Sequence, residues 1–268
     1  MNRSFVFPRA LRVAAAAVTL LAAHAPLLTA QAAPPADALP EAQQLFDRYA
    51  EAIGGRDRIM AVSSLHSTAE FEMPAAGIKG AMEIFAGKPN KSFVRMEFPG
   101  MGSTTTGFDG TVGWTIDPIQ GPALAEGGPL EYMRETADFL ETLGNIPDPA
   151  RYTSMETVGR VEMGGRPCWK VKLVSRTGRE SSNCYDTETG LLVGMERTQE
   201  SQMGKIATTI LLSDYRDFGG IRMPTKSVAS MMGQQMMVAT RTVELDTVQP
   251  SRFELPAEIR LLADARQP

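Results

Sequence analysis

Hydrophobic and polar residues alternate along most of the chain, in runs of about five to ten residues that Gly, Pro and Asn interrupt. A period of two is the pattern of a β-strand with one buried face, and short breaks of this kind are typical of an antiparallel meander. The pattern predicts strands over residues 65–73, 78–86, 92–98, 103–108, 112–116, 154–162, 168–175, 180–186, 191–199, 205–215, 223–230 and 235–245. A sheet with this many strands must curl or close.

Two segments have helical spacing instead. Residues 40–53 carry Leu45, Phe46, Tyr49 and Ile53 at this spacing, follow a Pro and end at Gly54-Gly55, which predicts an N-terminal helix. A short helical turn over residues 58–62 is expected to follow it.

The second helical segment, residues 129–141, interrupts the meander after a Gly/Pro-rich loop at 119–128. Its apolar residues Leu130, Met133, Ala137 and Leu140 fall on one helical face. A lone amphipathic helix in this position packs over one face of the sheet, either as a static cover or as a movable lid above a cavity. The sequence leaves both possibilities open.

The first 32 residues have the order of an export signal. Arg3, Arg9 and Arg12 precede an apolar stretch, and Ala30-Gln31-Ala32 is a small-x-small cleavage pattern. We therefore predict a signal peptide over 1–32, a tether over 33–38, one domain over 39–258 and a C-terminal tail over 259–268. The mature protein is expected to be soluble in the periplasm, with no integral membrane span.

Charge and composition exclude several classes of function. The chain has a net charge of -4, and without the signal 24 basic side chains face 31 acidic ones, which argues against nucleic-acid binding. His66 is the one histidine outside the signal, so no multi-histidine metal site can form. No nucleophile elbow, zinc-protease motif or phosphate loop is present. We expect no catalytic residues, no metal and no cofactor.

The two cysteines, Cys168 and Cys184, flank a predicted hairpin, and export makes a disulfide chemically possible. If Thr177-Gly178 form a two-residue turn, Cys184 lies opposite Val171 and the cysteines fall on different faces. A turn centred on Arg176 would bring them opposite each other. The pairing stays open.

Several short motifs occur in a characteristic order: Gly87-Lys88-Pro89-Asn90, Phe98-Pro99, Phe108-Asp109-Gly110, Trp114 to Pro118, Asp214 to Pro224 and Ser251 to Pro256. In this order the chain resembles the LolA-like family of periplasmic lipoprotein carriers and outer-membrane lipoprotein-sorting proteins. The resemblance implies a mainly β fold with helical cover: an unclosed antiparallel β-barrel with an N-terminal helix and an inserted lid helix. It also places Lys88 where the family has a basic residue, usually Arg, that holds the lid shut. Lys lacks the planar fork of Arg, so the latch is expected to differ here.

We therefore expect a carrier or sensor of a hydrophobic ligand, such as lipoprotein acyl chains or another lipid, that performs no covalent chemistry. Its partners would be an envelope donor and an envelope acceptor. Strand alternation suggests one apolar concave face formed by Met82, Ile84, Val94, Met96, Phe98, Trp114 and Ile116. Methionine suits such a face because its flexible thioether adapts to ligands of different shape. The alternatives are an enzyme that uses the cavity for a hydrophobic substrate and a protein-interaction module of the cell envelope.

Overall fold

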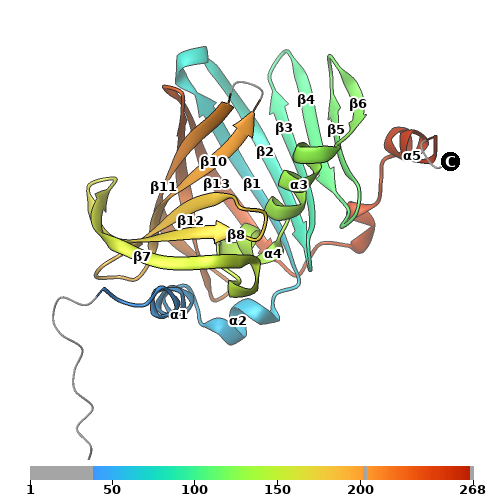
Figure 1. Ribbon diagram of the computed structural model, residues 1–268. Helices are drawn as coiled ribbons and strands as arrows, with labels where there is room; N and C mark the ends of the chain where they lie inside the picture. Colours follow the sequence, from blue (N-terminus) through green and yellow to red (C-terminus); the bar gives the residue numbers. More distant parts are fainter. Residues whose placement is uncertain (1–38, 202–203, 266–268) are drawn as a thin grey trace, which may run out of the picture. The chain divides into compact units, whose positions relative to one another are not determined.

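The computed structural model describes residues 39–201 and 204–265 of the chain (Figure 1). The predicted signal peptide and tether, at 1–32 and 33–38, lie outside the described residues.

Thirteen strands make up the sheet. They are β1 Ser64–Met73, β2 Ile78–Gly87, β3 Lys91–Phe98, β4 Gly102–Phe108, β5 Gly113–Asp117, β6 Gly121–Leu124, β7 Tyr152–Met163, β8 Arg166–Ser175, β9 Glu180–Asp186, β10 Leu192–Ser201, β11 Gly204–Phe218, β12 Ile221–Met231 and β13 Gln234–Leu245. All twelve predicted strands are present. The additional strand, β6, was expected to be loop because its four residues include Gly121 and Pro122.

Five α-helices accompany the sheet in the described part of the chain. They are α1 Ala42–Ala52, α2 Arg56–Ala61, α3 Gly127–Thr136, α4 Phe139–Gly144 and α5 Ala257–Asp264, with short 3-10 turns η1 Pro74–Ala76, η2 Pro149–Arg151 and η3 Pro250–Phe253. The predicted N-terminal helix is confirmed as α1, and α2 stands at the expected helical turn. Helix α5 occupies the segment that was expected to be a tail.

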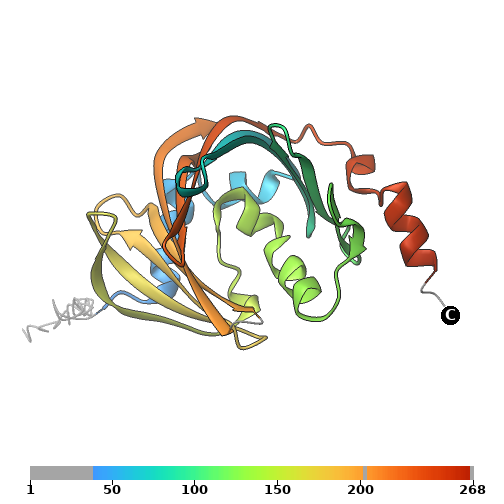
Figure 2. The same cartoon turned by 90° about the horizontal axis from the view of Figure 1, so that it is seen from above.

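The strands form one antiparallel sheet in the order β6-β5-β4-β3-β2-β1-β13-β12-β11-β10-β9-β8-β7. Strands β6 and β7 are its two edges and do not pair with each other, so the barrel is open. The sheet curls around α3 and α4, while α5 lies on its outer side (Figure 2). The predicted fold class, an unclosed antiparallel barrel with helical cover, is confirmed.

The main core lies at the end of the sheet that α1 covers. Leu45, Phe46 and Tyr49 of α1 are buried and pack with residues of β8 to β12 and with Phe139 and Leu143 of α4. The rings of Phe46 and Tyr49 lie 5.8 and 5.5 Å from the ring of Tyr185. Burial of this aromatic group fixes α1 against the sheet.

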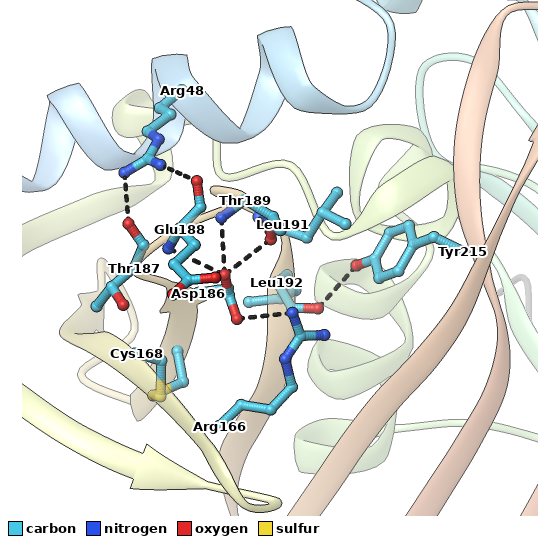
Figure 3. A network of polar contacts seen from close by, with 11 residues as sticks. Arg48, Arg166, Cys168, Asp186, Thr187, Glu188, Thr189, Leu191, Leu192 and Tyr215 are labelled. Carbon is cyan, nitrogen blue, oxygen red and sulfur yellow. Dashed lines mark hydrogen bonds and ion pairs between the residues drawn. A yellow bond between two sulfur atoms is a disulfide. The ribbon is translucent and has the colours of Figure 1, made fainter.

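Polar contacts at the β9–β10 turn complete the attachment of α1 (Figure 3). The Arg48 guanidinium donates to the carbonyl oxygens of Thr187, at 3.1 Å, and of Glu188. The turn is shaped by Asp186, which is 4% exposed and whose carboxylate accepts hydrogen bonds from the backbone N–H groups of Glu188 and Thr189. An ion pair of 2.8 Å between Asp186 and Arg166 ties the turn to the start of β8.

The two cysteines form a disulfide, with their Cα atoms 5.5 Å apart. Neither of the two turns considered is present: Val174 pairs with Glu180, so the loop is the three residues 176–178, centred on Thr177 and not on Thr177-Gly178 or Arg176. In this register Cys184 pairs with Lys170 and Cys168 pairs with Asp186. The cysteines are therefore diagonal neighbours on one face of the sheet, within reach of a disulfide.

Candidate ligand-binding site

Five of the predicted site residues share the concave face. Met82 pairs with Met96 and Ile84 pairs with Val94, so these four side chains project to one side, and Phe98 follows Met96 by two residues on β3. Further down the same face, the space beside Gly113 is filled by Leu130 and Met133 of α3. Because α3 lies inside the curl, this is the inner face of the sheet.

These five residues are only partly buried. The core beneath α1 contains residues that are 0 to 2% exposed, such as Val171 and Leu173. The upper part of the concave face therefore presents apolar side chains that no segment of the described chain fully covers. Such a surface is a candidate binding site for an apolar ligand.

Trp114 and Ile116 were expected on this face, and that prediction is wrong. Trp114 pairs with Gly107, which pairs with Phe93, and the rings of Trp114 and Phe93 lie 5.9 Å apart. Ile116 pairs with Thr105 on the same side. Both side chains project from the convex face, because the connection at residues 109–112 sets a register that the alternation within each strand does not reveal.

The C-terminal segment covers this convex aromatic patch. The Arg252 guanidinium lies over the rings of Phe85 and Phe93, 4.0 and 4.2 Å from their centres. His66 stacks on Phe85 at 4.3 Å, and its Nε2 atom lies 3.0 Å from Glu83. Trp114 is 2% exposed and packs edge-on against Phe93, so it is a structural residue of the outer layer.

The concave face continues onto the strands that follow β1 in the sheet. Leu212 pairs with Ser227, Ser227 with Val238, and Val238 with Phe71. Ile210, Ala229 and Met236 form a neighbouring row. Sequence reasoning missed these residues as members of the site. The alternation of Met236 with Val238 was the available signal, but β1 pairs with β13, and sequence order alone does not bring these two strands together.

Two helices stand where one was predicted. α3 ends at Thr136, and Asp138 starts α4 by accepting hydrogen bonds from the N–H groups of Leu140 and Glu141, at 3.0 and 3.1 Å. The predicted continuous helix over 129–141 is therefore wrong, because an Asp in its interior acts as an N-cap. Ala137, at the junction, is 1% exposed.

The two helices differ in how they are held. α4 inserts Phe139 and Leu143, at 1 and 0% exposed, into the core, and Leu140 packs beside them. No residue of α3 is buried, and its apolar residues Leu130 and Met133 remain partly exposed. Of the predicted lid, α4 is therefore anchored in the core and α3 rests on the concave face.

Lys88 contacts the anchored helix. Its ammonium group lies 5.7 Å from the centre of the Phe139 ring and donates to the carbonyl oxygen of Met60 at 2.5 Å. The backbone N–H of Phe139 also donates to the carbonyl of Pro89, at 3.2 Å. Lys88 thus joins α2 to α4 through a cation–π contact and a single donor, without the bidentate contact that Arg could make.

A second set of contacts holds α3 from the opposite end of the sheet. The carboxylate of Glu135 pairs with Arg179 at 2.6 Å and accepts a hydrogen bond from Thr177 at 2.6 Å. Arg151 pairs with Asp138 at 3.1 Å and donates to the carbonyl of Glu135 at 2.7 Å. Sequence reasoning missed this latch, because its basic side chains come from η2 and the β8–β9 loop, which lie next to α3 only in the folded chain.

Polar side chains on the concave face lie next to α4. The buried amide of Asn183 donates to the hydroxyl of Tyr185 at 3.0 Å, and Tyr152 donates to Glu141 at 3.2 Å. Burial raises the pKa of the Tyr152 and Tyr185 phenols, and the charge of Glu141 raises both further. These hydroxyls stay protonated at neutral pH and act as hydrogen-bonding groups.

The described residues contain no group of three or more His, Cys, Asp or Glu side chains that could hold a metal ion. Among those same residues, no helix is both long enough and apolar enough to cross a membrane.

The fold and the covered concave face define an open half-barrel of the LolA-like type. No family model matches the sequence, and no curated protein matches it either. Solved structures share the fold. A LolA superfamily protein from Nitrosomonas europaea superposes with a TM-score of 0.54 at 11% identity, over 81% of this chain and 99% of that one.

Two further solved structures share this fold. A DUF1329 family protein from Desulfovibrio piger gives a TM-score of 0.55 at 11% identity, over 81% of this chain and 98% of that one. An outer-membrane lipoprotein-sorting protein domain from Vibrio parahaemolyticus gives 0.52 at 9% identity, over 80% and 97%. At these identities the likeness concerns the fold, and function has to be argued from the site.

Proposed function

We propose that this protein is a periplasmic carrier or sensor that holds lipoprotein acyl chains or another lipid on the concave face of its sheet, without covalent chemistry. The observation that carries the proposal is the partly exposed apolar face around Met82, Ile84, Val94, Met96 and Phe98, beside a helical cover of which α4 is buried in the core and α3 is not. The order of the first 32 residues supports export.

Apolar burial alone supplies enough affinity for this role. Each methylene removed from water contributes about 0.8 kcal/mol before the entropic costs of binding. A ligand held in this way can be released when the cover opens, which suits transfer between an envelope donor and an envelope acceptor.

A matched pair of variants tests the proposal. Met96→Lys places a charge on the concave face, and Met237→Lys places the same charge on the convex face of β13, where Met237 is 37% exposed. We expect Met96→Lys to abolish binding of a fluorescent fatty acid while the thermal unfolding midpoint changes little, and Met237→Lys to bind as the unmodified protein does.

Two outcomes would count against the proposal. If Met96→Lys unfolds the protein, Met96 is ordinary core, since burying an unpaired charge destabilises a packed interior by several kcal/mol. If both variants bind equally well, the ligand does not occupy this face.

A further inference from the structure

We propose that Arg197 is the head-group site for an anionic amphiphile, a lipid with a carboxylate or phosphate, whose acyl chain lies along the concave face. This inference rests on the proposed function and adds the chemical class of the ligand.

Arg197 projects from the inner face of the sheet. It lies two residues after Met195, which pairs with Asn183 and Ile210 and belongs to the main core. Its own partners across the sheet are Ser181 on β9 and Thr208 on β11. An arginine with these neighbours brings a permanent positive charge to the interior of the curl.

The contacts of the guanidinium leave that charge without a carboxylate. Nη1 donates to the amide oxygen of Asn183 at 2.9 Å and to the carbonyls of Ser182 and Glu196 at 3.2 and 3.3 Å, while Nη2 contacts the sulfur of Met195 at 3.0 Å. Within residues 39–198 and 206–265, whose side chains the structure describes, no Asp or Glu carboxylate pairs with it within 4.0 Å. The two other arginines beneath the cover, Arg151 and Arg179, each have such a partner.

The orientation suits bidentate recognition. Nη1 donates to acceptors on β9 and β10, and Nε makes no hydrogen bond to the side chains described at residues 39–198 and 206–265. Nε and Nη2 can therefore donate two parallel hydrogen bonds to a carboxylate or a phosphate, the geometry in which arginine binds these groups most strongly.

The surroundings divide the concave face into a polar end and an apolar end. Beside Arg197 stand Ser181, Thr208 and the Asn183 amide, whereas the next row on β11 to β13 is Ile210, Ala229 and Met236. Three strand spacings, about 14 Å, separate β10 from β13. A head group at Arg197 therefore directs an acyl chain across β11 and β12 toward Phe71 and Met96.

Glu141 is the nearby negative charge that an anion must tolerate. Its carboxylate is held by the Tyr152 hydroxyl at 3.2 Å. The positive charge of Arg197 and the negative charge of Glu141 act on this phenol with opposite effects on its pKa. Replacing Glu141 with Gln should therefore strengthen binding of an anion and leave a neutral ligand unaffected.

The test compares laurate with dodecanol, which share a chain length and differ in head-group charge, by calorimetric titration of the full mature chain at pH 8. A charge-assisted hydrogen bond corresponds to a preference of about tenfold or more for laurate. We expect Arg197→Met to remove this preference and keep dodecanol affinity. The matched control Arg95→Met, on the convex face, should retain the preference.

Each of the other possible results contradicts a different part of the proposal. Equal affinity of the unmodified protein for laurate and dodecanol, or an unchanged preference in Arg197→Met, overturns the head-group site. Acetate binding as tightly as laurate overturns the amphiphile in favour of a small-anion site. If Arg197→Met does not fold, Arg197→Lys, which keeps the charge and loses the fork, should retain a reduced preference. Failure of the unmodified protein to bind either twelve-carbon ligand contradicts the proposed function itself.

Discussion

Asp186 shows how one carboxylate can hold together elements that are distant in sequence. Burial alone would raise its pKa, but hydrogen bonds from Thr189 and Glu188 and the charge of Arg166 outweigh burial and lower it below the usual value. Through Arg48, the turn that Asp186 shapes also fixes α1 over the core (Figure 3). The carboxylate therefore stabilises the covered end of the sheet.

Replacing Asp186 with Asn should cost about 1–3 kcal/mol of unfolding free energy at pH 7, the range for removing hydrogen bonds to a buried charged group. A pKa lowered in the folded state gives stability that is present above the unfolded value, about 3.9, and is lost as pH falls through the folded value. The difference between the variant and the unmodified protein, measured by urea unfolding, should therefore shrink at pH 3. Asp264→Asn, on the exposed end of α5, is the control, and a loss that is equal at both pH values would contradict this account.

At the level of single residues, sequence alternation predicted which residues of one strand share a face. It did not predict how neighbouring strands pair. It placed Met82 with Ile84 and Val94 with Met96 correctly, because successive residues of one strand alternate faces. It assigned Trp114 to the wrong face, because the register across a turn depends on the length of the loop. Arg197 was overlooked because a charged residue in a strand is ordinarily assigned to the solvent side.

At the level of elements, the division of the cover into α3 and α4 is the feature that matters most for function. α4 is fixed by Phe139 and Leu143 in the core, while α3 is held by polar contacts of Glu135 with Arg179 and Thr177. Since α3 buries no residue, its opening should cost much less free energy than global unfolding. The hinge is expected at Ala137 and Asp138.

Hydrogen exchange tests this division. Backbone amides of α3 should exchange faster than those of β1 and β2, and added laurate should slow α3 more than α1. Glu135→Gln, which weakens the latch to Arg179, should speed exchange in α3 and leave α4 unchanged, with Glu131→Gln on the exposed side of α3 as the control. Slow exchange throughout α3 that no lipid alters would make the cover static and would weaken the carrier proposal.

The sequence predicted the elements better than their boundaries and connections. All twelve strands and α1 follow from hydrophobic period and from Gly and Pro breaks. β6 was not predicted because a four-residue edge strand that contains Gly and Pro shows no hydrophobic alternation. The helical interruption was found, but its internal cap at Asp138 was not used, and the latch residues come from separate loops.

At the scale of the whole molecule, the proposed function requires export as well as a ligand-binding face. The basic residues, apolar stretch and Ala30-Gln31-Ala32 predict that the mature protein begins at Ala33. N-terminal sequencing of the protein from the periplasmic fraction of its native host should read Ala33 first. A chain that still begins at Met1, or that remains in the cytoplasm, would contradict the predicted location.

Extraction of the protein from its native compartment, with identification of the bound molecules by mass spectrometry, tests most directly whether the concave face holds a lipid. We expect acyl-chain lipids in stoichiometric amount, enriched in anionic head groups, and absent from Met96→Lys prepared in the same way. Protein that is consistently free of lipid, or Met96→Lys that carries the same lipids as the unmodified chain, would contradict the proposed function.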